Sequence, residues 1–192
     1  MRAVRRLLIG VLVLAALAVV ADWAWRQPFM LRPRTLWELS RMPPPDALAM
    51  PVAGVEARRV ADTFGAPRGK DRRHEGVDIF AARGTPVLSA TRGVIASVRE
   101  GGLGGRQVWV YGPAGQRHYY AHLDDWAPGI AEGDVLHEGS ALGTVGNTGN
   151  ARGTPPHLHY GVYGSGGAID PLPLLRTGAS TRTGQPAAEP ER

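Results

Sequence analysis

The stretch His157-Leu158-His159-Tyr160, late in the chain, sets two histidines two residues apart among apolar and aromatic neighbours. In an extended strand, side chains two apart lie on the same face, so His157 and His159 would point the same way. Leu158 and Tyr160 would then face the opposite side. The stretch therefore predicts a β-strand that carries two imidazoles on one of its faces.

A second stretch, His74-Glu75-Gly76-Val77-Asp78, adds a carboxylate to these imidazoles. Two imidazoles and one carboxylate are the ligand set of an open catalytic zinc site, whereas a closed structural site takes four ligands, usually including cysteines. The chain has no cysteine. A zinc site built from the two stretches would leave one histidine free to act on water.

The two ends of the second stretch must come close together if both bind one ion. A straight strand would separate His74 from Asp78 by roughly 13 Å, but two ligand atoms of one zinc ion lie about 3–4 Å apart. The chain must therefore turn between them, and Gly76 in the middle permits the turn.

The composition favours a β-rich, turn-rich domain over a helical bundle. The chain has 192 residues, with 26 glycines, 16 prolines and only 20% charged residues, enough for one domain with its own core. The formal charge is +5, but Arg2, Arg5 and Arg6 at the extreme N-terminus supply three of these charges. No stripe of basic residues interleaved with aromatic residues is present, which argues against nucleic acid as a partner.

The N-terminus has the layout of an export signal. Three arginines precede an apolar run from Leu7 to Ala21, as in a charged n-region followed by an h-region. The run is shorter than the roughly 20 residues that span a bilayer, yet Trp23 and Trp25 follow it, and aromatic residues favour the membrane interface. Residues 1–25 are predicted to be a signal peptide or, preferably, a signal anchor that contacts the cytoplasmic membrane through residues 7–25.

The positive-inside rule then places the rest of the chain outside the cytoplasm, in the periplasm or cell envelope. Residues 26–53 are rich in proline and are predicted to be a stalk. Residues 54–176 form the expected domain, and residues 177–192 lack apolar anchors and are expected to be a disordered tail.

Within the expected domain, short apolar segments alternate with turn residues, and no segment has sustained helical periodicity. This pattern predicts a mostly antiparallel β-fold with a groove. The predicted strands are Val77–Phe80, Pro86–Ala90, Gly93–Val98, Gln107–Tyr111, Arg117–Leu123, Ala141–Val145 and His157–Tyr163.

The segment Arg117–Leu123 holds a further histidine, His122. Strand alternation predicts that Tyr120 and His122 share one face and that the residues between and beside them are buried. Two glycine-rich stretches, Gly101–Gly105 and Gly146–Pro156, are interpreted as groove walls that admit an extended peptide. Neither matches a phosphate-binding loop, because the Lys-Ser/Thr pair is missing.

Taken together, these motifs resemble the lysostaphin-like, LytM-type zinc endopeptidases that cut the peptide part of bacterial peptidoglycan. The resemblance covers roughly residues 54 to 172. The matching motifs, in order, are Phe64-Gly65, His74-Glu75-Gly76-Val77-Asp78-Ile79, Gly84-Thr85-Pro86-Val87, Gly93-Val94, Tyr120-Ala121-His122-Leu123, Gly133-Asp134-Val135, Gly139, Gly143-Thr144-Val145-Gly146, Thr148-Gly149, His157-Leu158-His159 and Asp170-Pro171.

The resemblance implies that His74, Asp78 and His159 hold Zn²⁺ and that His122 and His157 are the catalytic pair. It also implies antiparallel sheets that form a groove, in a lipoyl-like hybrid-motif fold behind the N-terminal export or anchor helix. The remaining histidines, His118 and His137, match no catalytic position and are predicted to be surface or structural. Substrate-groove contacts are expected from Tyr120, Asn147, Thr148 and Arg106.

The expected activity is zinc-dependent hydrolysis of amide bonds in peptidoglycan stem peptides or cross-links, in remodelling of the cell wall. Which peptide bond is cut stays open, since relatives target glycine bridges or D-Ala–diaminopimelate cross-links. The alternative is a non-catalytic LytM-type regulator that activates a cell-wall amidase, a class that predicts eroded histidines. A lipoyl- or biotinyl-type carrier needs a lysine at its hairpin tip, and the single lysine, Lys70, lies outside that segment.

Overall fold

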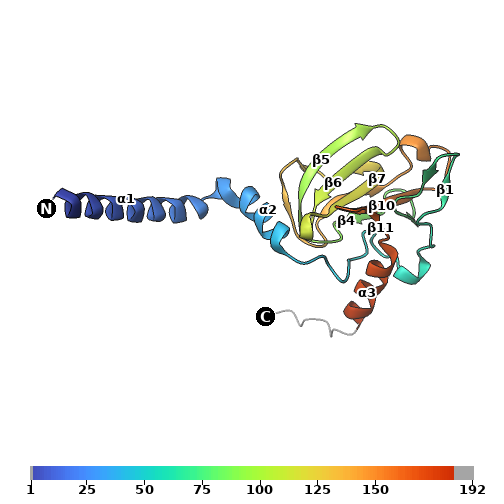
Figure 1. Cartoon of the computed structure of the whole chain (residues 1–192). Helices are drawn as coiled ribbons and strands as arrows, with labels where there is room; N and C mark the ends of the chain where they lie inside the picture. The colour runs from blue at the N-terminus through green and yellow to red at the C-terminus, as the bar shows by residue number, and fades with distance from the viewer. Residues whose placement is uncertain (1, 184–192) are drawn as a thin grey trace, which may run out of the picture.

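The computed structural model describes residues 2–183 and shows a β-rich body from which a long helix projects (Figure 1). This helix, α1 (Arg2–Trp25), is followed by the short 3-10 helix η1 (Pro28–Met30) and by α2 (Leu31–Arg41). The segment Val4–Trp25 is long and apolar enough to cross a membrane, and none of its apolar window is buried against the body. A helix of 24 residues is about 36 Å long, against about 30 Å for the hydrocarbon core of a bilayer.

Nine strands form one antiparallel sheet whose main path runs β11-β10-β7-β6-β5-β8. In addition, β3 pairs with β10, and β9 pairs with both β7 and β4. The strands are β3 (Val77–Phe80), β4 (Pro86–Leu88), β5 (Gly93–Gly101), β6 (Gly105–Tyr111), β7 (Arg117–Trp126), β8 (Val135–Leu136), β9 (Ala141–Val145), β10 (His157–Gly164) and β11 (Gly167–Ile169). The predicted antiparallel β-fold is confirmed.

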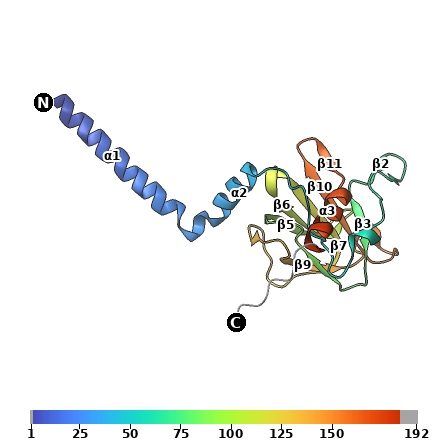
Figure 2. The same ribbon diagram turned by 90° about the horizontal axis from the view of Figure 1, so that it is seen from below.

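A separate two-stranded ribbon, β1 (Pro67–Arg68) and β2 (Arg72–Arg73), stands out from the body in Figure 2, where β2 is labelled. Three short 3-10 helices lie in the loops of the body: η2 (Ala57–Arg59), η3 (Pro113–Gly115) and η4 (Gly149–Ala151).

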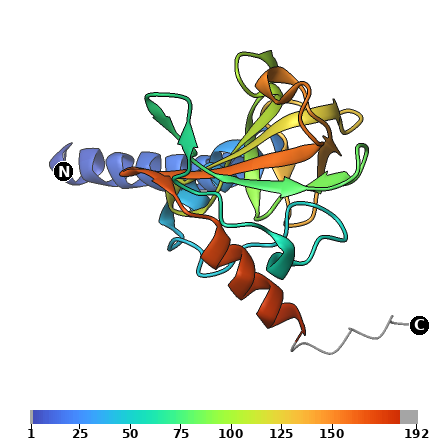
Figure 3. The ribbon, with the colours of Figure 1, turned by 90° about the vertical axis from the view of Figure 1, so that its right-hand side faces the viewer.

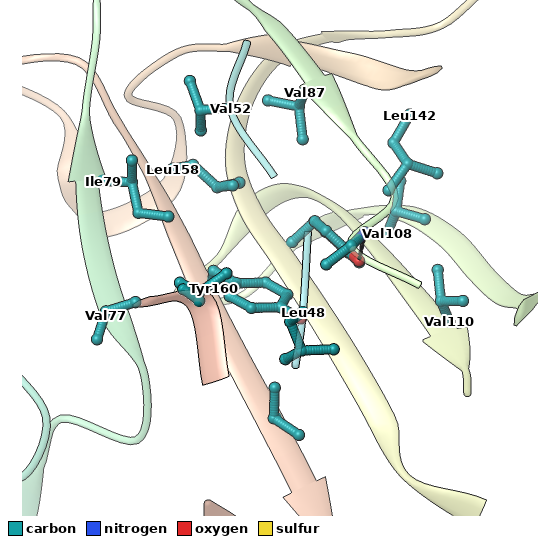
Figure 4. Close-up of a cluster of buried hydrophobic side chains, with 14 of the residues drawn as sticks. Leu48, Val52, Val77, Ile79, Val87, Val108, Val110, Leu142, Leu158 and Tyr160 are labelled. Atoms are coloured by element: carbon teal, nitrogen blue, oxygen red, sulfur yellow. Dashed lines mark hydrogen bonds between the residues drawn. The ribbon is translucent and has the colours of Figure 1, made fainter. Parts of the chain in front are cut away.

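The core lies on one face of the curled sheet and is built by strand alternation. Figure 4 shows Val77 and Ile79 of β3 beside Leu158 and Tyr160 of β10, with Val108 and Val110 of β6 farther along the sheet. All six side chains are at most 1% exposed. Because each strand buries every second residue, the residues between them are free to form a site on the other face.

The core begins before the predicted domain start at residue 54. Leu48 and Val52 are each 1% exposed and belong to the central apolar cluster (Figure 4). The backbone N–H of Leu88 donates to the Pro51 oxygen at 2.9 Å, so this segment runs along β4. The predicted boundary is therefore too late. The prolines of this segment suggested a stalk, but its apolar residues pack against the sheet.

The predicted stalk is also not a free spacer. In α2, Thr35 and Leu39 are buried, and Glu38 forms a 2.6 Å ion pair with Arg92, just before β5. The helix packs on β5, β8 and η3. Only the stretch around η1 separates α2 from the apolar helix α1.

The C-terminal segment corrects the predicted tail as well. The helix α3 (Leu172–Thr183) continues through residues 177–183, and residues 184–192 of the predicted tail lie outside the described residues. Leu172 and Leu175 anchor α3 in the core, and a Cβ on Gly178 would lie 2.1 Å from the Leu48 oxygen. Figure 3 shows α3 lying along the body beside η2.

Candidate metal centre and active site

Two adjacent strands place the carboxylate of Asp78 beside the ring of His159. In the antiparallel pair of β3 and β10, Asp78 lies directly opposite His159, and Cβ atoms in such positions are about 4.5–5.5 Å apart. Asp78 Oδ1 lies 3.2 Å from His159 Nδ1. The alternation that turns Val77 and Leu158 into the core thus turns both polar side chains to the outer face.

His74 reaches the same point because the chain turns between β2 and β3. Its Nδ1 lies 2.8 Å from the backbone oxygen of Thr63 and 3.1 Å from Arg68 Nη2. Because the nearer partner, the carbonyl oxygen, can only accept, we assign the proton to Nδ1. The Nε2 atom therefore keeps its lone pair, and it lies 2.9 Å from Asp78 Oδ1 and 2.8 Å from His159 Nδ1. Thr63 thus selects the tautomer that offers Nε2 to the site.

Gly76 is required at this turn for space. It is absent from the residues with positive φ, so backbone freedom is not the reason for a glycine. A Cβ at this position would lie 2.5 Å from the Tyr160 oxygen and 2.9 Å from His159 Cε1. The expected glycine is present, but its physical reason is the close approach of this segment to β10.

The donor atoms of His74, Asp78 and His159 fit a zinc ion. All lie within 4.8 Å of one another, and the three separations given above run from 2.8 to 3.2 Å. Ligands at about 2.0–2.1 Å in a tetrahedral zinc site are about 3.3 Å apart, so each atom would move outward by only tenths of an ångström. Two imidazole nitrogens and one carboxylate oxygen are also the donors that a catalytic zinc site uses.

The electrostatics of the cluster favour a negative carboxylate at Asp78 and a neutral ring at His159. Burial raises the pKa of Asp78, but hydrogen bonds with His159 and His74 outweigh burial and hold the pKa well below its ordinary value. Burial lowers the pKa of His159, although the Asp78 carboxylate opposes this shift. Metal ligands must be deprotonated to bind, and the pKa shifts of Asp78 and His159 favour that state.

His122 reaches the site through an unusual backbone conformation. Tyr120 and Leu123 both face the core, although a regular strand would put residues three apart on opposite faces. The extra residue is absorbed at His122, whose φ is +64°, a left-handed conformation that costs about 1–2 kcal/mol for a residue other than glycine. At this point β7 leaves β10, pairing Ala121 with His159, and joins β9, pairing Leu123 with Val145.

The ring of His122 is oriented by a backbone carbonyl. Its Nδ1 donates to the Thr148 oxygen at 2.9 Å, so the opposite nitrogen, Nε2, is left as an acceptor. Burial lowers the pKa of His122 to about 4, and the neighbouring rings of His157 and His159 contribute. The ring centroid lies 6.0 Å from that of His159.

His157 is held in the same way on the other side. Its Nδ1 donates to the Pro155 oxygen at 2.8 Å, which again leaves Nε2 as an acceptor. Its ring centroid lies 5.1 Å from that of His122 and 5.1 Å from that of Phe80. The structure therefore brings all five expected site residues to one place, three around a common point and two beside it.

The expected groove contacts are not where the sequence placed them. Tyr120 is fully buried, and its hydroxyl accepts the N–H of Ala90 at 2.9 Å, because it shares the core face with Tyr160. Thr148, Asn147 and Arg106 do not line the pocket that contains the histidines. Thr148 instead orients His122 through its carbonyl, and its hydroxyl donates to the Leu123 oxygen at 2.9 Å.

The pocket has a volume of about 790 Å³, and several residues that line it were not identified from the sequence. Tyr119 and Tyr163 line it, as do Arg68 and Arg72 of the β1–β2 ribbon. Tyr119 lies on the outer face because Tyr120 points inward, an outcome that depends on the pairing of β7 with β10. The basic run before His74 was the available signal for the ribbon.

Comparison with known proteins agrees with this geometry. The profile of Peptidase family M23 matches residues 72–171. The chain is 39% identical over 125 residues to the L-Ala–D-Glu endopeptidase of Bacillus subtilis, covering 59% of this chain and 38% of that protein. It is 29% identical over 136 residues to the peptidoglycan DD-endopeptidase ShyC of Vibrio cholerae, covering 68% of this chain and 30% of that protein. The chain thus spans less than two fifths of the length of these relatives.

Among solved structures, the fold is similar to the catalytic domain of the antimicrobial peptidase lysostaphin from Staphylococcus simulans. The TM-score is 0.55 at 31% identity, over 62% of this chain and 92% of that domain.

Proposed function

The chain belongs to peptidase family M23, and from this premise we propose that it is a zinc-dependent endopeptidase acting on amide bonds in the peptide part of peptidoglycan. The observation that carries the proposal is the complete set of site residues in one pocket. Three donor atoms converge within 3.2 Å, and two further histidines flank them. A domain that had lost catalysis would have no need for all five.

His74, Asp78 and His159 would hold the ion, and each is already oriented for the task. The Thr63 carbonyl fixes the ring of His74, and β-pairing fixes His159 against Asp78. Bound by these residues, zinc would supply Lewis acidity for activating water and polarising a carbonyl. The low pKa of Asp78 keeps its carboxylate charged at any pH at which the imidazoles are neutral.

His122 and His157 would carry out proton transfer as a pair. Both rings donate their Nδ1 proton to a backbone carbonyl, which leaves Nε2 as the acceptor, and both side chains line the pocket. Either ring can accept the proton of an attacking water, and a ring so protonated can donate it to the departing amine. The other can donate to the developing negative oxygen once it is itself protonated.

The names of the two relatives support a substrate with peptide amides that involve D-residues. One is named for the L-Ala–D-Glu bond and the other as a peptidoglycan DD-endopeptidase. The apolar helix α1 supports an exported chain tethered to the membrane. We therefore propose that residues 1–25 are a signal anchor and that the body lies outside the cytoplasm, on the outer side of the membrane.

The test compares wild type, His159→Ala and the exposed control His137→Ala, as full chains in detergent. Zinc content is measured by elemental analysis, and products from purified peptidoglycan are identified by mass spectrometry. We expect wild type and His137→Ala to bind one equivalent of zinc and to release peptides. His159→Ala should lose more than the 10–100-fold in zinc affinity that removal of an outer-sphere partner costs.

Two outcomes would overturn the proposal. One is a wild-type protein that binds zinc and leaves every peptidoglycan amide intact. The other is stimulation of a cell-wall amidase that survives His159→Ala, which would favour the regulatory alternative.

A further inference from the structure

The ribbon of β1 and β2 is a strongly basic projection at the edge of the pocket. Between Pro67 and Arg73 the chain carries four basic residues and a single acidic residue, Asp71. Figures 2 and 3 show the ribbon standing away from the sheet, next to the segment that leads into β3. None of these residues is a metal or proton-transfer residue in the proposed function.

The register of the ribbon places two of its arginines side by side. Arg68 lies directly opposite Arg72 in the antiparallel pair, and directly opposite residues project from the same face of a ribbon. Like charges in this position destabilise the pairing. Such an arrangement is favourable only where negative charge lies between or beside the two guanidinium groups.

The two guanidinium groups have different partners. Arg68 donates to Asp78 Oδ2, the oxygen that does not face His159. Its charge is therefore already paired with the carboxylate of Asp78. Arg72 forms no side-chain hydrogen bond or ion pair within residues 2–183, although it lines the same pocket. The other arginine of the ribbon, Arg73, donates to the Gly65 oxygen at 3.1 Å.

Two carboxylates, Asp71 and Glu75, line the same pocket, and neither forms an ion pair with Arg72 among the described residues. Glu75 interacts with the hydroxyl of Tyr163, whose pKa burial and Glu75 raise to about 12. Asp71 forms no ion pair with Arg72 among the described residues. The wall of the pocket formed by the ribbon therefore presents one free guanidinium group, backed by the charge of Arg68.

We propose that Arg72 binds a carboxylate of the substrate, so that the protein selects peptides with a free carboxylate next to the scissile amide. Such peptides are of the stem-peptide class, whereas a glycine bridge carries no side-chain or α-carboxylate within its length. This inference rests on the proposed endopeptidase function and names its substrate class. A planar guanidinium group suits carboxylate recognition because it can donate two parallel hydrogen bonds.

The experiment uses two synthetic peptides that differ only in a carboxylate or a carboxamide on the residue next to the scissile amide, together with pentaglycine. Specificity is measured as the ratio of kcat/KM for the two peptides, with wild type, Arg72→Gln and the control Lys70→Gln. Lys70 lies at the tip of the same ribbon and does not line the pocket, so its loss removes the same charge without the contact.

We expect wild type to prefer the carboxylate peptide by about 10- to 100-fold, as for a charge-assisted hydrogen bond. The ratio should fall toward one in Arg72→Gln and persist in Lys70→Gln. Arg72→Glu should reverse the preference, and added salt should weaken it, because Arg72 is exposed and its attraction is screened.

Equilibrium binding separates this inference from the proposed function. The zinc-loaded His122→Ala protein is titrated with both peptides by calorimetry, which needs no turnover. A preference for the carboxylate peptide that disappears on adding Arg72→Gln supports the subsite even if no hydrolysis is found. Equal cleavage or binding of the two peptides by wild type, or a preference that survives Arg72→Gln, would overturn it and leave the endopeptidase proposal standing.

Discussion

His118 and His122 lie four residues apart on the same strand, β7, and share the properties often taken to mark a functional histidine. Both are buried, and burial lowers the pKa of each to about 4. Yet His118 lies in the core, with Nδ1 2.8 Å from the Tyr160 hydroxyl. His122 lies in the pocket, beside the rings of His157 and His159.

The difference between the two histidines is one of backbone conformation. His118 sits in regular strand, opposite Val162 of β10, and so follows the core face with Tyr120. His122 has φ of +64° and moves to the other face. Burial and a lowered pKa therefore do not distinguish the pocket histidine from the core histidine in this protein, whereas the local change of face does.

The largest expected effect separates the two histidines by activity. His122→Ala should lower the rate of amide hydrolysis by about 10²–10⁴-fold, the usual contribution of a proton-transfer group, and should leave zinc content unchanged. His118→Ala should keep the wild-type rate below its melting temperature, because its ring does not reach the pocket. Steady-state kinetics on one peptide, with zinc measured in each sample, decide the matter, and a comparable rate loss in both variants would contradict the distinction.

The second expected effect concerns pH and His118. Its folded pKa of about 4 lies below the unfolded value of about 6.5, so the unfolded chain binds more protons between these values. This contribution to stability is present above pH 6.5 and is lost as pH falls toward 4, by about 3 kcal/mol in total.

His118→Gln removes this titration and keeps a side chain that can hydrogen-bond. We expect the free energy of unfolding, from urea denaturation at pH 7 and at pH 4.5, to fall less in His118→Gln than in wild type. Identical falls in the two proteins would show that His118 is not neutral in the folded state. His122 adds a slope of the same sign to both proteins and cancels in the comparison.

The smallest expected effect tests the backbone directly through matched glycine and alanine variants. At position 122, Gly should be more stable than Ala by about 1 kcal/mol, because only glycine adopts positive φ without strain. At position 118 the order should reverse by about 0.5–1 kcal/mol, because glycine weakens a regular strand. Thermal unfolding of the four variants gives both differences, and the same order at both positions would rule out the left-handed conformation.

Strand alternation and residue chemistry were enough to predict the sheet and a group of two imidazoles and one carboxylate, whereas the choice of His74, Asp78 and His159 came from the family resemblance. His157 and His159 lie on one face of β10, and the register with β3 brings Asp78 to His159. These features repeat with a period of two along single strands, so sequence spacing reveals them. The turn at Gly76 was also predictable from the chemistry of a shared ion, although its steric reason was not.

The features that alternation could not predict depend on contacts between distant segments. Tyr120 was expected in the groove and is in the core. The left-handed conformation of His122 places Tyr120 on the same face of the sheet as Leu123, which strand alternation alone does not predict. The ring partners of His74 and His122 are backbone carbonyls of Thr63 and Thr148, and any residue type provides a carbonyl. The early start of the core at Leu48 depends on its contact with α3.

The docking of α2 on the sheet has a consequence for where such an enzyme could work. With α1 embedded in a bilayer, the link to the body would be the short stretch from Arg26 to Met30, since buried Thr35 and Leu39 hold the next helix against the body. The pocket could then contact only the part of the cell wall that lies close to the membrane surface. Layers of the wall farther from the membrane would be out of its reach. Inserting residues into that link should increase the distance from the membrane that the pocket can reach, without altering the chemistry.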